Sequence, residues 1–158
     1  MRRYFILASF LLIVTLGSAG CDDNTNSDFT APTEVTFDLA DLAEILFARG
    51  YPIEVGDEEV VDFFPIPVRH LTVFDEDVLV LQFVGPNTAA AFASTISSDG
   101  TTVNGRVIDW PATPHFFLSG QVIVLYLGDD PQVIFAIQEI MGAQFAGGEV
   151  VLTVEESS

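Results

Sequence analysis

Asp109, His115 and Ser119 have the residue types of a hydrolase triad, in which a histidine accepts the proton of a nucleophilic hydroxyl and a carboxylate orients that histidine. Their closeness along the chain argues against a triad, because on one extended ribbon the serine cannot easily meet both partners. The strained Gly-x-Ser-x-Gly turn that exposes a nucleophile is also missing. We therefore interpret Asp109 as a turn acceptor and His115 as a strand-edge or pocket histidine. A hydrolase that uses the Asp109/His115 region is the alternative.

The two histidines, His70 and His115, would bind a metal only if their hairpins pair and an acidic neighbour joins them. The sequence has no His-x-x-x-His and no clustered Cys/His spacing. Three acidic groups, at 57–59, 75–77 and 129–130, offer the oxygen ligands that calcium prefers, but none shows the alternating Asp-x-Asp-x-Asp-Gly loop. We therefore expect no metal and no cofactor, and interpret the carboxylates as solvated turn charge and helix caps.

The densest group of aromatic and proline residues surrounds Trp110, the single tryptophan. Trp110, His115 and Phe116 are the candidate ligand-binding residues, because aromatic side chains with a few polar groups are typical of ligand pockets. The other interpretation is a rigid loop that packs on the core. The sequence favours the packed loop and leaves the pocket as a hypothesis.

The charge of the chain excludes one class of partner. Five arginines and no lysine stand against 23 acidic residues, and every acidic residue follows Cys21. Without the first 20 residues, three arginines and 23 acids leave a net charge of −20. So negative a protein repels phosphate backbones, and we expect no nucleic-acid partner.

Residues 1–20 have the three parts of a secretory signal peptide. Arg2 and Arg3 are followed by an apolar stretch from Tyr4 to Leu16 and then by small residues. This stretch is shorter than the ~20 residues that a comfortable membrane span needs. The pattern therefore predicts export and removal of this segment.

Cys21 follows the small residues Ala19 and Gly20, and the stretch 16–21 resembles the lipobox of bacterial lipoproteins. Ser18 departs from the leucine that is usual at its position. The resemblance implies cleavage before Cys21, lipidation of its thiol with acyl chains such as palmitate, and a location in the bacterial cell envelope. The anchor would hold the domain on the extracytoplasmic side of a membrane. Ordinary secretion with a free thiol is the alternative.

We expect four segments: a signal peptide at 1–20, the lipidated cysteine with a flexible tether at 21–34, a domain at 35–154 and a polar tail at 155–158. Apolar periodicity, caps and turn residues predict three helices, which begin near Leu39, Pro86 and Pro131. Asp38 and Asp130 are the predicted caps of the first and third helices, and Asp99–Gly100 is the predicted end of the second. The predicted strands cover 51–55, 68–74, 78–84, 102–110, 115–118 and 122–127, with a further edge strand at 149–154. Asn104–Gly105 is a tight-turn pair that interrupts the segment 102–110.

These elements predict a single α+β domain with three helices and an antiparallel sheet of about six strands, in the order αβββαβββα. A shift of 44 residues places 78–81 on 122–125, which raises the hypothesis of an internal duplication. Residues 109–117 and 120–130 resemble a pattern in uncharacterised bacterial secreted and lipoprotein domains. The resemblance extends over about 38–147, and it supplies neither an activity nor a catalytic residue.

The predicted strands at 78–84 and 122–127 are apolar on nearly every position, with Gln82 as the polar exception. Half-exposed antiparallel strands alternate apolar and polar residues, so both faces of this sheet must be covered. We expect either a homodimer through the sheet or an apolar groove bordered by Trp110 and Phe116. The leading hypothesis is a non-enzymatic lipoprotein that binds a protein or a small molecule; a structural envelope protein without a specific ligand is a further alternative.

Overall fold

The computed structural model describes residues 36–149. The predicted signal peptide, Cys21, the tether and the polar tail lie outside the described residues. The described chain forms the predicted α+β domain, with three helices, a six-stranded sheet and a small two-stranded sheet. The fold class and the order of the main elements are therefore confirmed.

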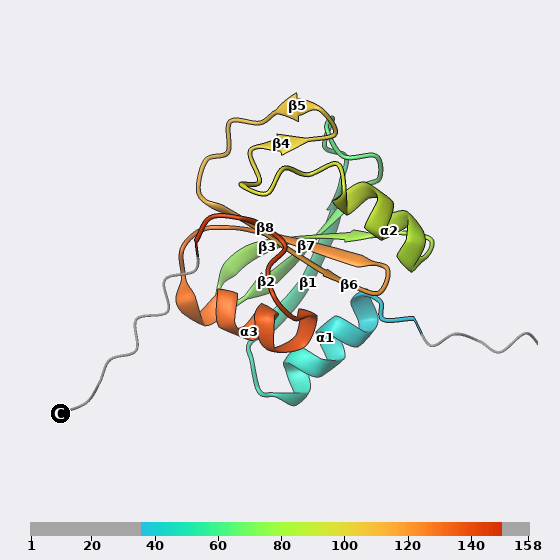
Figure 1. Cartoon of the computed structure of the whole chain (residues 1–158). Coiled ribbons are helices and arrows are strands. Elements are labelled where there is room, and N and C mark those ends of the chain that lie inside the picture. Colours follow the sequence, from blue (N-terminus) through green and yellow to red (C-terminus); the bar gives the residue numbers. More distant parts are fainter. Residues whose placement is uncertain (1–35, 150–158) are drawn as a thin grey trace, which may run out of the picture. The chain divides into compact units, whose positions relative to one another are not determined.

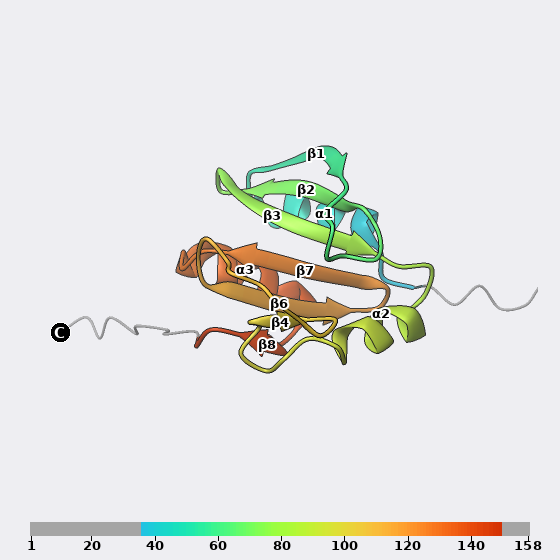
Figure 2. The ribbon, with the colours of Figure 1, turned by 90° about the horizontal axis from the view of Figure 1, so that it is seen from above.

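The six strands of the main sheet pair antiparallel throughout, in the order β1-β2-β3-β7-β6-β8 (Figure 2). Their bounds are β1 Ile53–Glu59, β2 Val68–Val73, β3 Glu76–Gln82, β6 Pro114–Ser119, β7 Val122–Leu127 and β8 Ala146–Gly147. The small sheet pairs β4, Thr102–Val103, with β5, Arg106–Val107. The helices are α1 Leu39–Ala48, α2 Pro86–Ala93 and α3 Pro131–Met141.

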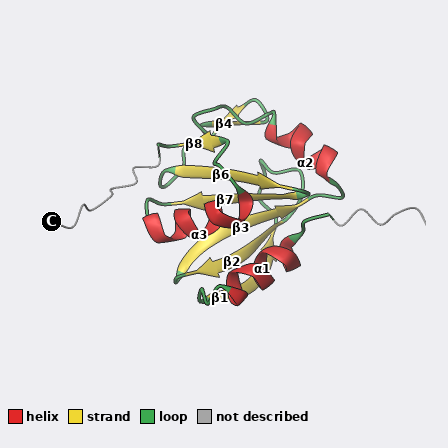
Figure 3. Ribbon diagram, turned by 60° about the horizontal axis from the view of Figure 1, so that its bottom comes forward, coloured by secondary structure: helices red, strands yellow, loops and turns green. Residues whose placement is uncertain are grey.

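Helices α1 and α3 lie on one face of the sheet, and α2 lies on the other with the β4–β5 segment (Figure 1). Figure 3 shows α1 and α3 together in front of the strands. Each of the two helices has an aspartate cap. The Asp38 carboxylate accepts from the backbone N–H of Asp41 at 3.0 Å, and the Asp130 carboxylate accepts from that of Gln132 at 2.7 Å. These caps fix where the helices begin and so which faces they present to the sheet.

Strand β7 shows why the central strands are apolar on both sides. Val124 and Tyr126 are buried under α1 and α3, whereas Ile123 and Leu125 are buried on the α2 face. The second face is covered by α2, by the loop that carries Phe63 and Phe64, by the Trp110 loop and by the segment around Ala146. The apolar pattern therefore does not require a second copy of the chain to cover the sheet.

Several predicted boundaries were wrong. Helix α2 ends at Ala93 rather than before Asp99, because Ile96 already forms a β-bridge with Val103. The predicted segment at 102–110 contains only the short strands β4 and β5, which are joined by the tight turn expected at Asn104–Gly105. The short strand β8 was not predicted, and the edge strand expected at 149–154 stays a prediction, because all but its first residue lie outside the described residues.

The two acidic loops were also misplaced. Residues 57–59 belong to β1, which continues past an irregularity between Val55 and Glu58. The β2–β3 hairpin turns at Phe74 and Asp75, both with positive φ (52° and 68°), so Glu76 already lies in β3. Acidic side chains that the sequence assigned to solvated turns therefore lie on the sheet.

The segments that align after a shift of 44 residues are neighbours at the centre of the sheet. Strands β3 and β7 pair antiparallel, with Val80 opposite Val124. The helices that follow these strands, α2 and α3, lie on opposite faces. The likeness between the two halves therefore does not extend beyond the strands.

Candidate functional site

Trp110 packs on the α2 face of the core and holds its loop there. Its Nε1–H donates to the carbonyl of Gly100 at 2.8 Å, and its ring meets Phe63 edge-on with centroids 5.3 Å apart. Its ring also contacts Phe116, whose side chain is fully buried beneath it. This geometry is that of the packed loop, and it leaves no exposed surface on Phe116.

His115 is buried on the opposite face, where its ring stacks on Tyr126 with centroids 6.2 Å apart. Its Nδ1 lies 2.7 Å from Oε1 of Gln144, whose amide nitrogen donates to the carbonyl of Gly148. Because an amide oxygen only accepts, this contact assigns the proton to Nδ1. Nε2 lies 3.9 Å from the Asp129 carboxylate, beyond hydrogen-bond distance. His115 therefore links β6 to the segment after α3.

The triad suggested by residue types is not assembled. Ser119 lies four residues beyond His115 on the same strand, which is about 13 Å at the usual rise. Asp109 is exposed in the loop before that strand, and the ring nitrogens of His115 face Gln144 and Asp129 instead. The catalytic alternative thus has no geometric support at this position.

The two histidines do not meet either. His70 lies on β2 and His115 on β6, and strands β3 and β7 separate them in the sheet. His115 pairs with Tyr126, which faces α1 and α3, whereas His70 pairs with Leu79, which packs on the α2 face. The sheet itself lies between the two rings, so they cannot share a metal ion.

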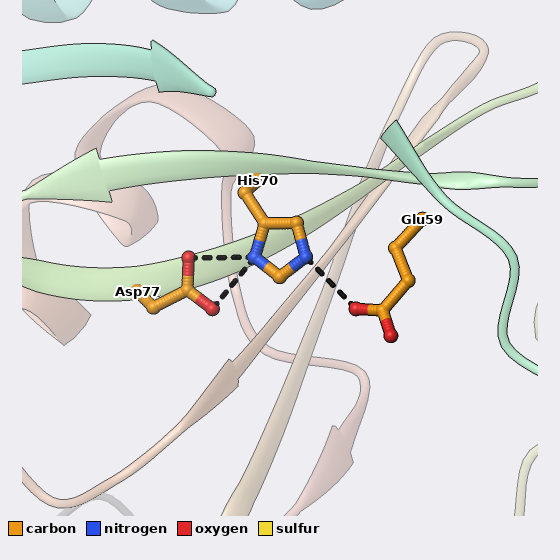
Figure 4. A network of polar contacts seen from close by, with 3 residues as sticks. All are labelled: Glu59, His70 and Asp77. Carbon is orange, nitrogen blue, oxygen red and sulfur yellow. Dashed lines mark hydrogen bonds and ion pairs between the residues drawn. The ribbon is translucent and has the colours of Figure 1, made fainter. Parts of the chain in front are cut away.

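A polar network that the sequence did not predict surrounds His70 (Figure 4). Its Nδ1 lies 2.9 Å from both carboxylate oxygens of Asp77, and its Nε2 lies 3.2 Å from Oε2 of Glu59. The three residues come from β2, β3 and β1, so one imidazole connects three neighbouring strands. The hydrogen bond to Asp77, assisted by Glu59, raises the pKa of His70 despite a smaller opposing effect of desolvation.

The His70 network, formed by Glu59, His70 and Asp77, connects three strands and does not have the geometry of a metal site. Each ring nitrogen of His70 faces a different carboxylate, whereas a metal needs its ligand atoms to converge on one point. Within residues 36–149, no group of three or more histidine, cysteine, aspartate or glutamate side chains is arranged to hold a metal ion. Another acidic side chain on β1 has a cationic partner: Glu58 accepts from Arg69 at 2.6 Å.

Two hollows open on the surface of the described domain. The larger, about 990 Å³, lies between the first turns of α1 and strands β1 to β3, and its rim includes Glu58, Arg69 and Gln82. The smaller, about 430 Å³, is lined by Tyr51, Phe74, Pro131, Gln132 and Phe135. We call it the aromatic pocket. Trp110, His115 and Phe116 line neither hollow, and the side chains of His115 and Phe116 are fully buried, so the candidate residues from the sequence do not form a surface site.

Comparisons of the chain with protein-family models, with curated proteins and with solved structures gave no match. In the part of the chain that the structure describes, no helix has the length and apolarity needed to cross a membrane. The function must therefore be inferred from the N-terminal pattern and from the chemistry of the described residues.

Proposed function

We propose that the chain is a lipid-anchored protein of the bacterial cell envelope whose acidic α+β domain is a non-enzymatic binding domain. The observation that carries this proposal is the order of residues 1–21: two arginines, a short apolar stretch, small residues and then the single cysteine of the chain. Acylation of Cys21 would supply an anchor, because each buried methylene contributes about 0.8 kcal/mol to membrane binding.

The polar contacts of the domain support binding rather than catalysis. The residues with the types of a triad lie apart, and the two histidines have structural partners in Gln144 and in Asp77. The acidic surface supports a domain that faces the aqueous compartment, because anionic lipid headgroups repel it. The same charge favours a partner or ligand with positive charge.

Labelling with palmitate in a bacterial host tests the anchor. The wild-type protein should take up the label. Cys21→Ser should remain unlabelled, because the chain has no other cysteine. This variant should also keep residues 1–20. Ser18→Ala is the matched control, since it keeps a small residue near the cleavage site and should still be labelled. Label on Cys21→Ser, or none on the wild-type protein, would overturn the proposal.

A further inference from the structure

Three aromatic side chains from distant parts of the chain converge at the aromatic pocket. Tyr51 follows α1, Phe74 lies in the β2–β3 turn, and Phe135 lies on α3. The rings of Tyr51 and Phe74 form a corner, with centroids 5.2 Å apart and planes 57° from parallel. Phe135 remains 51% exposed, although aromatic side chains of this size are usually more buried. The pocket is thus lined by three aromatic side chains, of which Phe135 is exposed and the other two are partly buried.

The walls of this corner are held in place before any ligand binds. The Tyr51 hydroxyl donates to Oε2 of Glu139 at 2.9 Å, and Arg49 donates to the same oxygen at 2.7 Å. The hydrogen bond to Glu139 raises the pKa of Tyr51. The Phe74 backbone has a φ of 52°, a conformation that is uncommon for a bulky side chain, and its N–H donates to the carbonyl of Pro52.

Acidic residues flank two of the lining residues in the sequence. Asp75 directly follows Phe74, and Asp130 directly precedes Pro131, so each acidic residue is a chain neighbour of a lining residue. The nearby cation, Arg49, is neutralised by its ion pair with Glu139. No carboxylate belongs to the lining itself, which consists of three aromatic residues with Pro131 and Gln132.

Aromatic faces attract cations through the negative potential above the ring, and such rings are the usual binding site for quaternary ammonium groups. We propose that the aromatic pocket binds a small organic cation of the quaternary ammonium class, held between the rings of Tyr51, Phe74 and Phe135. The volume of about 430 Å³ lies within the usual range for small-molecule sites. This inference rests on the proposed function of the domain as a binding domain and names the class of its ligand.

Calorimetric titration of the full-length protein in a nonionic detergent with choline tests the assignment. Choline should bind, and 3,3-dimethyl-1-butanol, its neutral isostere, should not, because the uncharged molecule fills the same space without the attraction of a cation to the rings. Equal binding of the neutral isostere, or no binding of choline, would overturn the proposal. Phosphocholine distinguishes a free cation from a lipid headgroup. It should bind more weakly, because the strongly acidic domain repels its phosphate. Tighter binding of phosphocholine would contradict the ligand class proposed.

Phe135→Leu and Phe47→Leu form a matched pair of variants. Both remove an exposed aromatic ring from a helix and keep an apolar side chain, but Phe47 lies outside the pocket. Phe135→Leu should weaken choline binding about fivefold to tenfold, and Phe47→Leu should leave it unchanged. Unchanged binding by Phe135→Leu would contradict the proposal. Palmitate labelling of the same samples reports the anchor separately, so failure of the pocket and failure of the anchor are distinguishable.

Discussion

The Nδ1 atom of His70 lies 2.9 Å from both carboxylate oxygens of Asp77, on the neighbouring strand of the sheet. The two residues are diagonal neighbours across the β2–β3 hairpin, since Asp77 pairs with Thr72 and His70 pairs with Leu79. Glu59 on the edge strand β1 approaches the other ring nitrogen. Protonation of one imidazole therefore strengthens the connection among three strands.

The contribution of His70 to stability should depend on pH. Its pKa is raised in the folded protein, chiefly by the hydrogen bond to Asp77. The stabilisation is therefore complete below the unfolded-state pKa of about 6.5 and is lost as the pH rises through the higher folded-state pKa. We expect His70→Gln to lower the free energy of unfolding at acidic pH by no more than about 1 kcal/mol, because the side chain is partly exposed. The effect should be smaller at alkaline pH, where the imidazole of the wild-type protein is neutral.

Urea denaturation of wild type and His70→Gln at several pH values measures this difference. The two proteins are compared at the same pH, so the effect of the remaining titratable groups on the free energy of unfolding is the same in both and drops out of the difference. Asp77→Asn is the companion variant, and it should reduce the pH dependence because it removes the largest cause of the pKa shift. If the difference in free energy of unfolding between wild type and His70→Gln stays constant with pH, the contribution of His70 does not depend on the charge of its ring.

Gln144 should contribute to stability through His115. Gln144→Leu removes the acceptor of a buried N–H and leaves that donor without a partner, which costs about 1–3 kcal/mol. The double variant His115→Phe/Gln144→Leu should lose less than the sum of the two single variants, because both polar groups are then removed together. Denaturant titration of the four proteins gives the coupling energy, and strict additivity would contradict the contact.

Gly120 and Gly105 separate two effects of substituting a turn glycine. Both have positive φ, 54° and 76°, so alanine is strained at either position. At Gly120 a Cβ would also lie 2.7 Å from the carbonyl oxygen of Phe37, whereas at Gly105 it would meet nothing within 4 Å. Gly105→Ala should therefore cost about 1 kcal/mol and Gly120→Ala clearly more. Equal shifts in the thermal midpoint would show that the segment at Phe37 moves freely.

Local signals in the sequence were sufficient for most of the elements. Asp130 followed by Pro131 predicted the start of α3, and Asn104–Gly105 predicted a tight turn, because caps and positive-φ turns depend on a few adjacent residues. The apolar pattern of β7 also predicted a strand covered on both faces. Periodicity within one segment was enough for these conclusions, and so for the fold class.

The sequence by itself therefore determined the acidic charge and the α+β class, and it carries the N-terminal pattern on which the proposed export rests. Only the tertiary structure decided which side chains meet. The turn at Phe74 escaped prediction because a phenylalanine rarely adopts positive φ, and this turn brings Asp77 to His70. Strand register and helix placement bring Tyr51, Phe74 and Phe135 together. Such contacts depend on packing between segments far apart in the chain, so they cannot be predicted from the spacing of residues along one segment.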